Sequence, residues 1–407
     1  MLKKLATVIA ITVVWSAVLP AQAQSADNWY AFLYNGITRQ LLRVGMDGSS
    51  TMFDLGVGPN VFLGGQDMAF SPDGSRVAYC ANRANPDSPQ GDTVVVVRDL
   101  AAGANIMELP LGGSIGCRVT RSGFNADASQ VAVSVVRYYP NAPDMDTSGP
   151  IWRLAVVDVA SSSIVAELNS ESPVVGAAGV APNVAMLPDV RYFDGSQVIF
   201  AEVPWGIGGA PEWNAFIWQP GAGTLQLDTT GRWGKSGVSF LAATGELVWL
   251  DNDPNLPAST PGGPIPTFNV VKLADRGGVE KVIYQNGEWV LVNTQFINGG
   301  VQLGVLLLST FDAENPGQQQ SRWIALGRDG AVSELAAGTT FSQLAGAPGG
   351  AVLFELAFSA DFTQQSFTLS LIGEQNTVLW QADDPGWEFA SATPVASPVD
   401  LPPFPAA

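Results

Sequence analysis

A strand–turn–strand phrase occupies residues 68–79 and reads Met-Ala-Phe-Ser-Pro-Asp-Gly-Ser-Arg-Val-Ala-Tyr. Short apolar runs flank an Asp-Gly pair, which is a strong local signal for a tight turn between two antiparallel strands. Weaker copies of this phrase occur at residues 124–133 and 192–200. Repeated β-units of this kind are typical of a repeat architecture, so the spacing of the copies decides the fold.

Later copies keep only the turn and the strand that follows it. The second turn residue of the six copies falls at positions 74, 128, 195, 245, 300 and 350. The spacing averages about 55 residues, slightly more than the roughly 40–50 residues of a four-stranded propeller blade. Without its first 23 residues, the chain would hold about seven such units.

Each unit continues with two more strands around a second tight turn. Residues 94–99 and 106–109 flank the turn at 101–103, and similar pairs of strands flank 161–163 and 328–330. The sequence therefore predicts an all-β fold, a single seven-bladed β-propeller of four-stranded antiparallel blades. A six-bladed ring and two six-stranded sandwiches are the alternatives.

The two ends of the chain complement each other. Residues 29–34, 41–45 and 52–55 are expected to form the second, third and fourth strands of a blade that lacks its first. Residues 387–395 form a lone strand after the last complete unit. We expect this C-terminal strand to pair with the N-terminal blade and close the ring, which removes an unpaired edge.

The N-terminus has the pattern of a secretory signal peptide. Lys3 and Lys4 precede an apolar run over residues 5–19, and Ala21-Gln22-Ala23 matches a small-residue cleavage site. We predict a signal peptide at 1–23, a propeller at 24–396 and a disordered Pro-rich tail at 397–407. These features predict an exported protein, periplasmic or extracellular, with no membrane insertion after cleavage.

The phrase at residues 70–79 resembles the blade signature of the TolB-type propeller repeats of exported bacterial proteins. This resemblance implies a propeller fold and export. It carries no function across, because a TolB protein has an α/β domain before its propeller and this chain begins its first blade almost at the cleavage site.

Charge and composition exclude several classes of function. The formal net charge is −18, with 19 basic against 37 acidic residues. Binding to nucleic acid depends on Lys and Arg neutralising phosphates, so neither nucleic acid nor an anionic membrane surface is an expected partner. The chain contains no His, which excludes Ser-His-Asp catalysis and His metal sites. We predict no catalytic residue, no resident cofactor and a monomer.

The remaining chemistry lies in carboxylates and cysteines. Asp251 and Asp253 lie in a long connection and could hold Ca²⁺ through hard oxygens, although Asp-x-Asp is more often a solvated turn. Cys80 and Cys117 are the only cysteines, and two cysteines in an exported chain favour a disulfide over two buried thiols. We expect Cys80 at the end of one strand and Cys117 at the start of another, both near the face of the ring that carries the long connections.

Long connections point to one face of the ring as the working face. Let A to D denote the strands of a blade outward from the axis. The predicted B–C connections are long, 81–92 and 251–267 among them, whereas the A–B and C–D turns are tight. Four aromatic residues in these connections are candidate ligand-binding residues: Tyr138, Tyr139, Trp205 and Trp213. Aromatic residues on rigidly held loops are favoured for binding proteins or sugars.

The sequence thus favours a non-enzymatic scaffold that binds a protein or polysaccharide through its B–C/D–A face. The alternatives are an exported glycan hydrolase that uses loop carboxylates and a purely structural cell-surface module.

Overall fold

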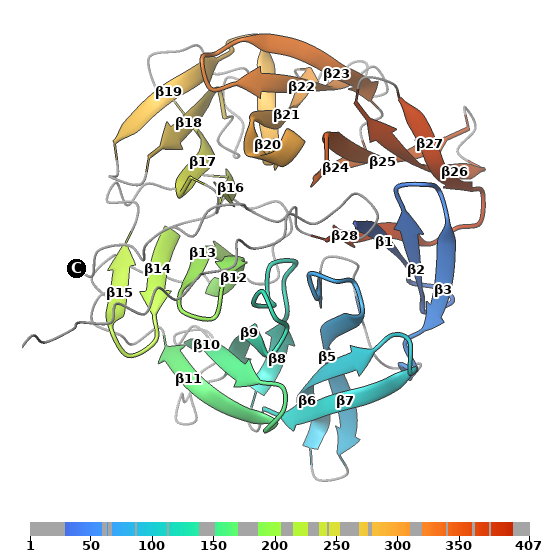
Figure 1. Cartoon of the computed structure of the whole chain (residues 1–407), viewed down its shortest axis with the longest axis vertical. Coiled ribbons are helices and arrows are strands. Elements are labelled where there is room, and N and C mark those ends of the chain that lie inside the picture. Colours follow the sequence, from blue (N-terminus) through green and yellow to red (C-terminus); the bar gives the residue numbers. More distant parts are fainter. Residues whose placement is uncertain are drawn as a thin grey trace, which may run out of the picture.

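The computed structural model describes sixteen stretches of the chain. The described residues are 29–58, 63, 67–85, 88–111, 114–137, 151–169, 186–204, 215–226, 236–241, 244–252, 268–275, 279–309, 320–338, 341–359, 363–373 and 376–393. Over these residues, seven antiparallel sheets of four strands follow one another around a ring (Figure 1). The predicted seven-bladed propeller is therefore confirmed.

The blades are numbered in chain order, and the strands of each are given from A to D. Blade one contains β28 (Trp387–Ala392), β1 (Tyr30–Asn35), β2 (Gln40–Gly45) and β3 (Ser50–Asp54); blade two contains β4 (Met68–Phe70), β5 (Arg76–Asn85), β6 (Ser88–Asp99) and β7 (Ala104–Pro110); blade three contains β8 (Ser114–Arg118), β9 (Gln130–Arg137), β10 (Ile151–Asp158) and β11 (Ser163–Asn169); blade four contains β12 (Met186–Phe193), β13 (Val198–Pro204), β14 (Ala215–Gln219) and β15 (Gly223–Gln226). Blade five contains β16 (Ser236–Leu241), β17 (Glu246–Asp251), β18 (Val270–Ala274) and β19 (Glu280–Gln285); blade six contains β20 (Trp289–Ile297), β21 (Gln302–Ser309), β22 (Ser321–Gly327) and β23 (Val332–Gly338); blade seven contains β24 (Phe341–Ala347), β25 (Gly350–Phe358), β26 (Gln365–Ile372) and β27 (Thr377–Ala382).

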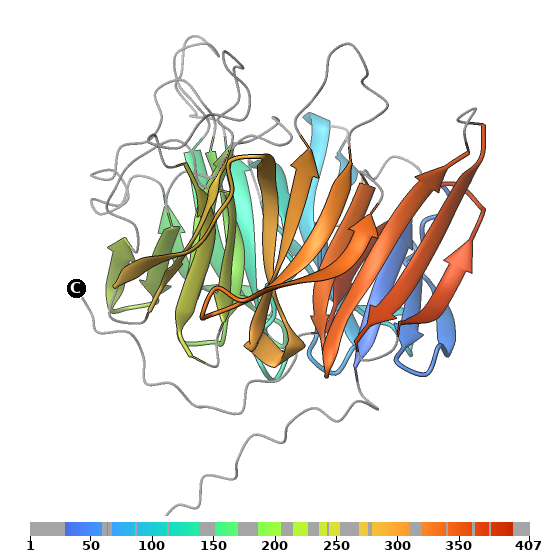
Figure 2. The ribbon, with the colours of Figure 1, turned by 90° about the horizontal axis from the view of Figure 1, so that it is seen from above.

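Antiparallel pairing within each blade gives the ring two different faces. Figure 2 shows the blades from the side, with their strands running between these faces. We call the face with the A–B and C–D connections the turn face, and the face with the B–C and D–A connections the loop face. The short 3₁₀ segment η3 (Asn298–Gly300) lies in the A–B turn of blade six, so it belongs to the turn face.

The predicted A–B turns adopt the left-handed backbone that tight turns require. Positive φ angles occur at Gly74, Ala128, Gly195, Gly245 and Gly300, which are five of the six predicted positions. In blade seven the positive φ lies at Gly349 and not at position 350. At Gly74, φ is +67° and an added Cβ would lie 2.8 Å from Cδ2 of Tyr30. Glycine is needed there for both reasons.

The C-terminal strand closes the ring, as predicted. β28 pairs antiparallel with β1, and Figure 1 shows the red strand beside the blue one. Two reciprocal hydrogen bonds finish the seam: Tyr30 N donates to the side-chain Oγ1 of Thr393 at 2.9 Å, and Thr393 N donates to Tyr30 O at 2.8 Å. The strand ends at Ala392, and residues 394 and 395 lie outside the described part of the chain.

Hydrophobic side chains fill the space between neighbouring blades. The rings of Phe32 in blade one and Phe70 in blade two stack at 3.9 Å. Trp152 of blade three and Phe200 of blade four meet edge to face at 5.6 Å. Such two-sided burial explains the continuous apolar runs in the strands.

One predicted loop is instead a hairpin. Residues 81–92 were expected to connect strands B and C of blade two, but β5 runs to Asn85 and β6 begins at Ser88. Asn82 still pairs with Thr93 in the ladder, and Thr93 Oγ1 donates to Asn82 Oδ1 at 3.3 Å. Backbone pairing needs no apolar side chain, so the strands continue beyond the hydrophobic pattern that marks them in the sequence. Across the described residues, no helix is long and apolar enough to cross a membrane.

Candidate functional site

The longest connections between strands lie on the loop face. On the turn face, the seven C–D connections are short, as in 159–162 between β10 and β11. On the loop face, residues 170–185 join β11 to β12 and residues 252–269 join β17 to β18. The B–C connection of blade one is short, because residues 36–39 form a turn. The predicted long B–C connections therefore exist in blades three to six, whereas four D–A connections on the same face, such as 286–288 and 339–340, are short.

The four predicted aromatic residues, Tyr138, Tyr139, Trp205 and Trp213, lie outside the described residues. Their strands end at the loop face, since β9 ends at Arg137 and β13 ends at Pro204. A binding role for these aromatics stays a prediction.

Asp251 is the last residue of β17, and it forms an ion pair. Its Oδ2 lies 2.6 Å from Nζ of Lys272, which also lies 3.8 Å from Oε2 of Glu280. Calcium takes six to eight oxygen ligands. In the part of the chain that the structure describes, no three Asp, Glu, Cys or His residues are grouped closely enough to hold a metal. Asp253 lies outside the described residues, so the calcium site stays a prediction.

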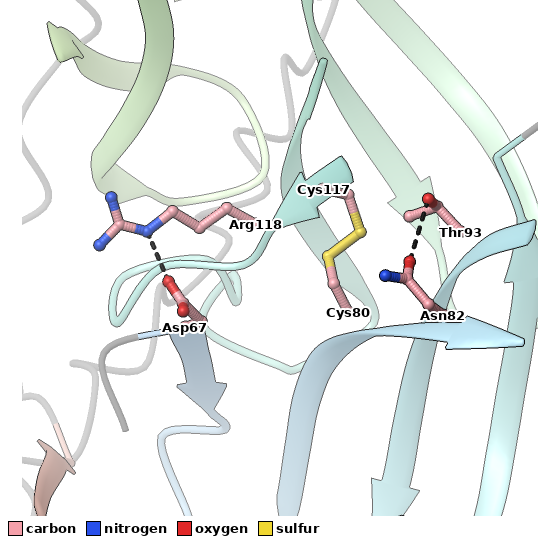
Figure 3. The surroundings of a disulfide bond; sticks show 6 residues. All are labelled: Asp67, Cys80, Asn82, Thr93, Cys117 and Arg118. Atoms are coloured by element: carbon pink, nitrogen blue, oxygen red, sulfur yellow. Dashed lines mark hydrogen bonds and ion pairs between the residues drawn. A yellow bond between two sulfur atoms is a disulfide. The ribbon is translucent and has the colours of Figure 1, made fainter. Parts of the chain in front are cut away.

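The disulfide between Cys80 and Cys117 is present, as predicted, with Cα atoms 5.7 Å apart (Figure 3). Its location differs from the expectation of two strand ends beside the loop face. Cys80 lies in the middle of β5, and Cys117 packs with it against the core between blades two and three. Nε of Arg118 also donates to Oδ1 of Asp67 at 2.8 Å. Blades two and three are thus held together by a covalent bond and an ion pair.

Three half-buried side chains form a patch on the loop face between blades five and six. This aromatic patch consists of Tyr284, Trp289 and Arg322. The guanidinium of Arg322 lies over the ring of Trp289, with Cζ 4.3 Å from the ring centroid. Asn286 fixes both aromatic residues, because its Nδ2 donates to the Tyr284 hydroxyl at 2.8 Å and its Oδ1 accepts from Trp289 N at 3.1 Å.

Sequence reasoning missed the aromatic patch. Trp289 is the first residue of strand A of blade six, and Arg322 lies at the start of strand C. A Trp at the start of a strand, two residues after the Asn286-Gly287 turn, was the only available signal. The contact with Arg322 depends on the register between β20, β21 and β22 and could not be read from the chain.

A second feature lies at the centre of the ring. Arg121 follows β8 in blade three, and its Nη2 donates to Oε1 of Gln343 at 2.8 Å and to Phe389 O at 3.4 Å. Gln343 belongs to blade seven and Phe389 to blade one, so the side chain of Arg121 joins blade three to two other blades of the ring. Its Cζ also lies 5.2 Å from the Phe389 ring centroid. Arg121 therefore links strands that are far apart in the sequence.

Two further arginines lie near Arg121, and we call the three the channel arginine cluster: Arg118, Arg121 and Arg191. Burial lowers the pKa of Arg121 to about 10; Asp189 opposes this shift, and Arg118 and Arg191 add to it. The guanidinium is still charged at neutral pH. Asp189 lies 3.0 Å from Nη2 of Arg191, and Asp67 binds Arg118. Sequence analysis did not single out any of these residues.

The turn face has a cleft of about 680 Å³ between blades five and six. Leu241, Val301 and Val332 line it together with the glycines of the turns. Arg328, which also lines the cleft, has its Nη2 2.6 Å from Oε2 of Glu246 and donates from this nitrogen to Gly300 O at 3.0 Å. The surface of the cleft is mainly apolar.

No protein-family model matches the chain, and no curated protein matches its sequence. Solved structures resemble it in fold. Prolyl oligopeptidase B from Galerina marginata matches with a TM-score of 0.53 and 12% identity, over 90% of this chain and 51% of that one. Acylaminoacyl peptidase from Pyrococcus horikoshii matches with a TM-score of 0.52 and 13% identity, over 88% and 49%. Oligogalacturonate lyase from Vibrio parahaemolyticus matches with a TM-score of 0.46 and 12% identity, over 88% and 91%.

The chain spans about half the length of the two peptidases. At these identities the similarity shows the shared β-propeller fold alone. The prediction that the chain is a β-propeller repeat protein is therefore confirmed.

Proposed function

We propose that this protein is an exported, non-enzymatic recognition scaffold that binds a protein or an extracellular polymer through its loop face. The observation that carries this proposal is the difference between the two faces. Long connections leave the rigid blades on the loop face, where the aromatic patch also lies, whereas the turn face consists mostly of short turns. Loops held by a rigid scaffold are the usual place for recognition.

The polar groups of the turn face support this assignment, because many of them are used within the turns themselves. Asp73, Asp127 and Asp194 each accept hydrogen bonds from the serine two residues later, from both its N–H and its hydroxyl. A carboxylate used in this way stabilises a turn and is less available to a ligand. The recurrence of this pattern in blades two, three and four also supports our proposal that these blades belong with the TolB-type repeats.

The chemistry of the aromatic patch fits a recognition role. Trp, Tyr and Arg are the residues most enriched among those that dominate the energy of protein interfaces. The indole of Trp289 packs against the guanidinium of Arg322, and Asn286 holds the main chain of Trp289, so less side-chain entropy remains to be lost on binding. The disulfide supports export, since disulfides persist in oxidising compartments.

Affinity capture from the envelope and culture fractions of the producing cells tests the proposal. The wild-type protein is compared with the double variant Trp289→Ala/Arg322→Ala, and Val301→Ser on the turn face serves as the matched control. We expect the double variant to lose at least about tenfold in retained partner, as removal of interface hot spots does. Retention should be unchanged in the control.

Two results would contradict this function. Equal capture by the wild type and the double variant would show that the aromatic patch does not bind the partner. Catalytic cleavage of envelope glycans by the purified wild-type protein would overturn the non-enzymatic assignment.

A further inference from the structure

The cleft on the turn face opens beside the outermost strand of blade six. Leu241 of blade five and two valines of blade six, Val301 and Val332, line it. Val301 is 64% exposed and Val332 is 51% exposed. Gly299 also lines the cleft, and a Cβ added to this residue would have no atom within 4 Å. Exposed apolar surface that several residues share is typical of an interaction site.

Val332 is also the first residue of β23, which forms the free edge of blade six. The strand order of this blade is β20-β21-β22-β23, and Figure 1 shows β23 at the rim of the ring. Among the described residues, no strand pairs with the outer side of β23. Val332, Ser333 and Glu334 are all exposed. An open edge of this kind is a template on which another strand can pair.

The hydrogen bonds of the turn before β23 show which of its backbone groups are open. Gly327 N donates to Ala331 O at 2.7 Å, so these two residues form a hydrogen-bonded pair. Hydrogen-bonded and non-hydrogen-bonded pairs alternate along an antiparallel ladder. Val332 and Glu334, which lie opposite residues 326 and 324, therefore occupy non-hydrogen-bonded positions. Their N–H and C=O groups point away from β22, toward the open edge.

The side chains on this edge select the chemistry of a partner strand. Residues two apart in a strand point to the same side of the sheet, so Glu334 lies on the same side as Val332. A large apolar residue opposite Val332 would extend the apolar surface of the cleft. A Lys or Arg two residues away would lie opposite Glu334, where a charge of opposite sign is favourable. Glu334 forms no ion pair with another described residue, so its carboxylate is available to such a partner.

We propose that the open edge of β23 binds an extended segment of a partner protein that carries a large apolar residue and, two residues away, a Lys or Arg. Hydrogen bonds to the backbone of Val332 and Glu334 supply affinity, and the cleft and the Glu334 carboxylate supply specificity, as in strand addition to a sheet edge. A second copy of this chain is disfavoured, because each copy has a net charge of −18. The site is separate from the aromatic patch, so it goes beyond the proposed loop-face function and does not depend on it.

Fluorescence polarisation with the full chain at constant ionic strength tests the proposal. The probe is the labelled peptide acetyl-Thr-Lys-Thr-Leu-Thr-Lys-Thr-amide, whose symmetry about Leu suits either strand direction. We expect saturable binding, and at least about tenfold weaker binding when Leu is replaced by Ser or both Lys are replaced by Glu. Absence of saturable binding, or equal binding of the three peptides, would overturn the proposal. Self-association of the chain through this edge in place of peptide binding would overturn it as well.

Reversal of the charge at residue 334 separates recognition from folding. Glu334→Lys should reverse the preference, so that the peptide with two Glu binds more tightly than the peptide with two Lys. Asp384→Lys makes the same change of charge at an exposed residue between β27 and β28, and this matched control should keep the wild-type preference. An unchanged preference in Glu334→Lys would refute the assignment. Capture of the loop-face partner should be unchanged in Glu334→Lys, so failure of this site and failure of the loop-face proposal give different results.

Discussion

Removal of β28 should unfold blade one while leaving the remaining blades paired. The perturbation is a truncation after Asp384, which deletes the strand that pairs with β1. The matched control is a truncation after Thr393, which removes only the residues that follow the seam. Both variants lack the C-terminal tail, so their difference isolates the strand.

The magnitude follows from what β28 buries. Phe389 is fully buried, Trp387 is 8% exposed, and both belong to the core between blades seven and one. Replacing one buried Phe or Trp by Ala costs about 3–5 kcal/mol. Deletion also leaves the backbone N–H and C=O groups of β1 that pair with β28 without partners. The loss should exceed about 5 kcal/mol, which is comparable to the whole stability of a typical domain, about 5–15 kcal/mol.

Amide hydrogen exchange and urea unfolding test this expectation. In the variant truncated after Asp384, the amides of β1 and β2 should lose protection, whereas those of blades four and five should keep most of theirs. The unfolding midpoint should fall relative to the control. Equal midpoints and equal protection of β1 in the two truncated proteins would show that the seam does not stabilise the ring.

Three further predictions concern stability. Replacing both Cys80 and Cys117 by Ser removes a cross-link that spans 37 residues and should cost about 4 kcal/mol in urea unfolding, with no further loss when a reductant is added. The Ser129 hydroxyl and N–H lower the pKa of Asp127, so the charged carboxylate stabilises the folded state. The wild-type protein should therefore be more stable than Asp127→Asn above about pH 4 and lose this advantage as the pH falls below that value. An advantage that persists at pH 2 would contradict this reasoning. Gly74→Ala should cost more than about 1 kcal/mol because of its positive φ and the close Tyr30 ring, whereas Gly287→Ala, with nothing within 4 Å, should change stability little.

Several parts of the fold could be predicted because they depend on local chemistry. The Asp73-Gly74 turn requires a left-handed residue, and the glycine makes that requirement visible in the sequence, as it does at Gly195. Strand B of blade one could be recognised without a strand A before it, which is why the pairing of β28 with β1 could be expected.

Other parts could not be predicted because they depend on pairing beyond the apolar pattern. Strand β5 continues to Asn85 through polar residues, since its ladder with β6 is made by backbone groups. That extension also moved Cys80 from an expected strand end to the middle of a strand. The disulfide between the two cysteines could be predicted because they are the only two in the chain, but the position of each cysteine along its strand could not.

The sequence by itself determined the blade, its repetition and the closure of the ring, because turns and apolar strands are encoded within a few residues. Only the tertiary structure decided what lies at the centre. Arg121, Gln343 and Phe389 come from blades three, seven and one, and they meet because closure brings the inner strands around one axis. The aromatic patch arises in the same way, because the register of the strands, and not the spacing of the residues in the sequence, brings Trp289 and Arg322 together. Contacts of this range follow from the geometry of the whole ring, which no single repeat contains.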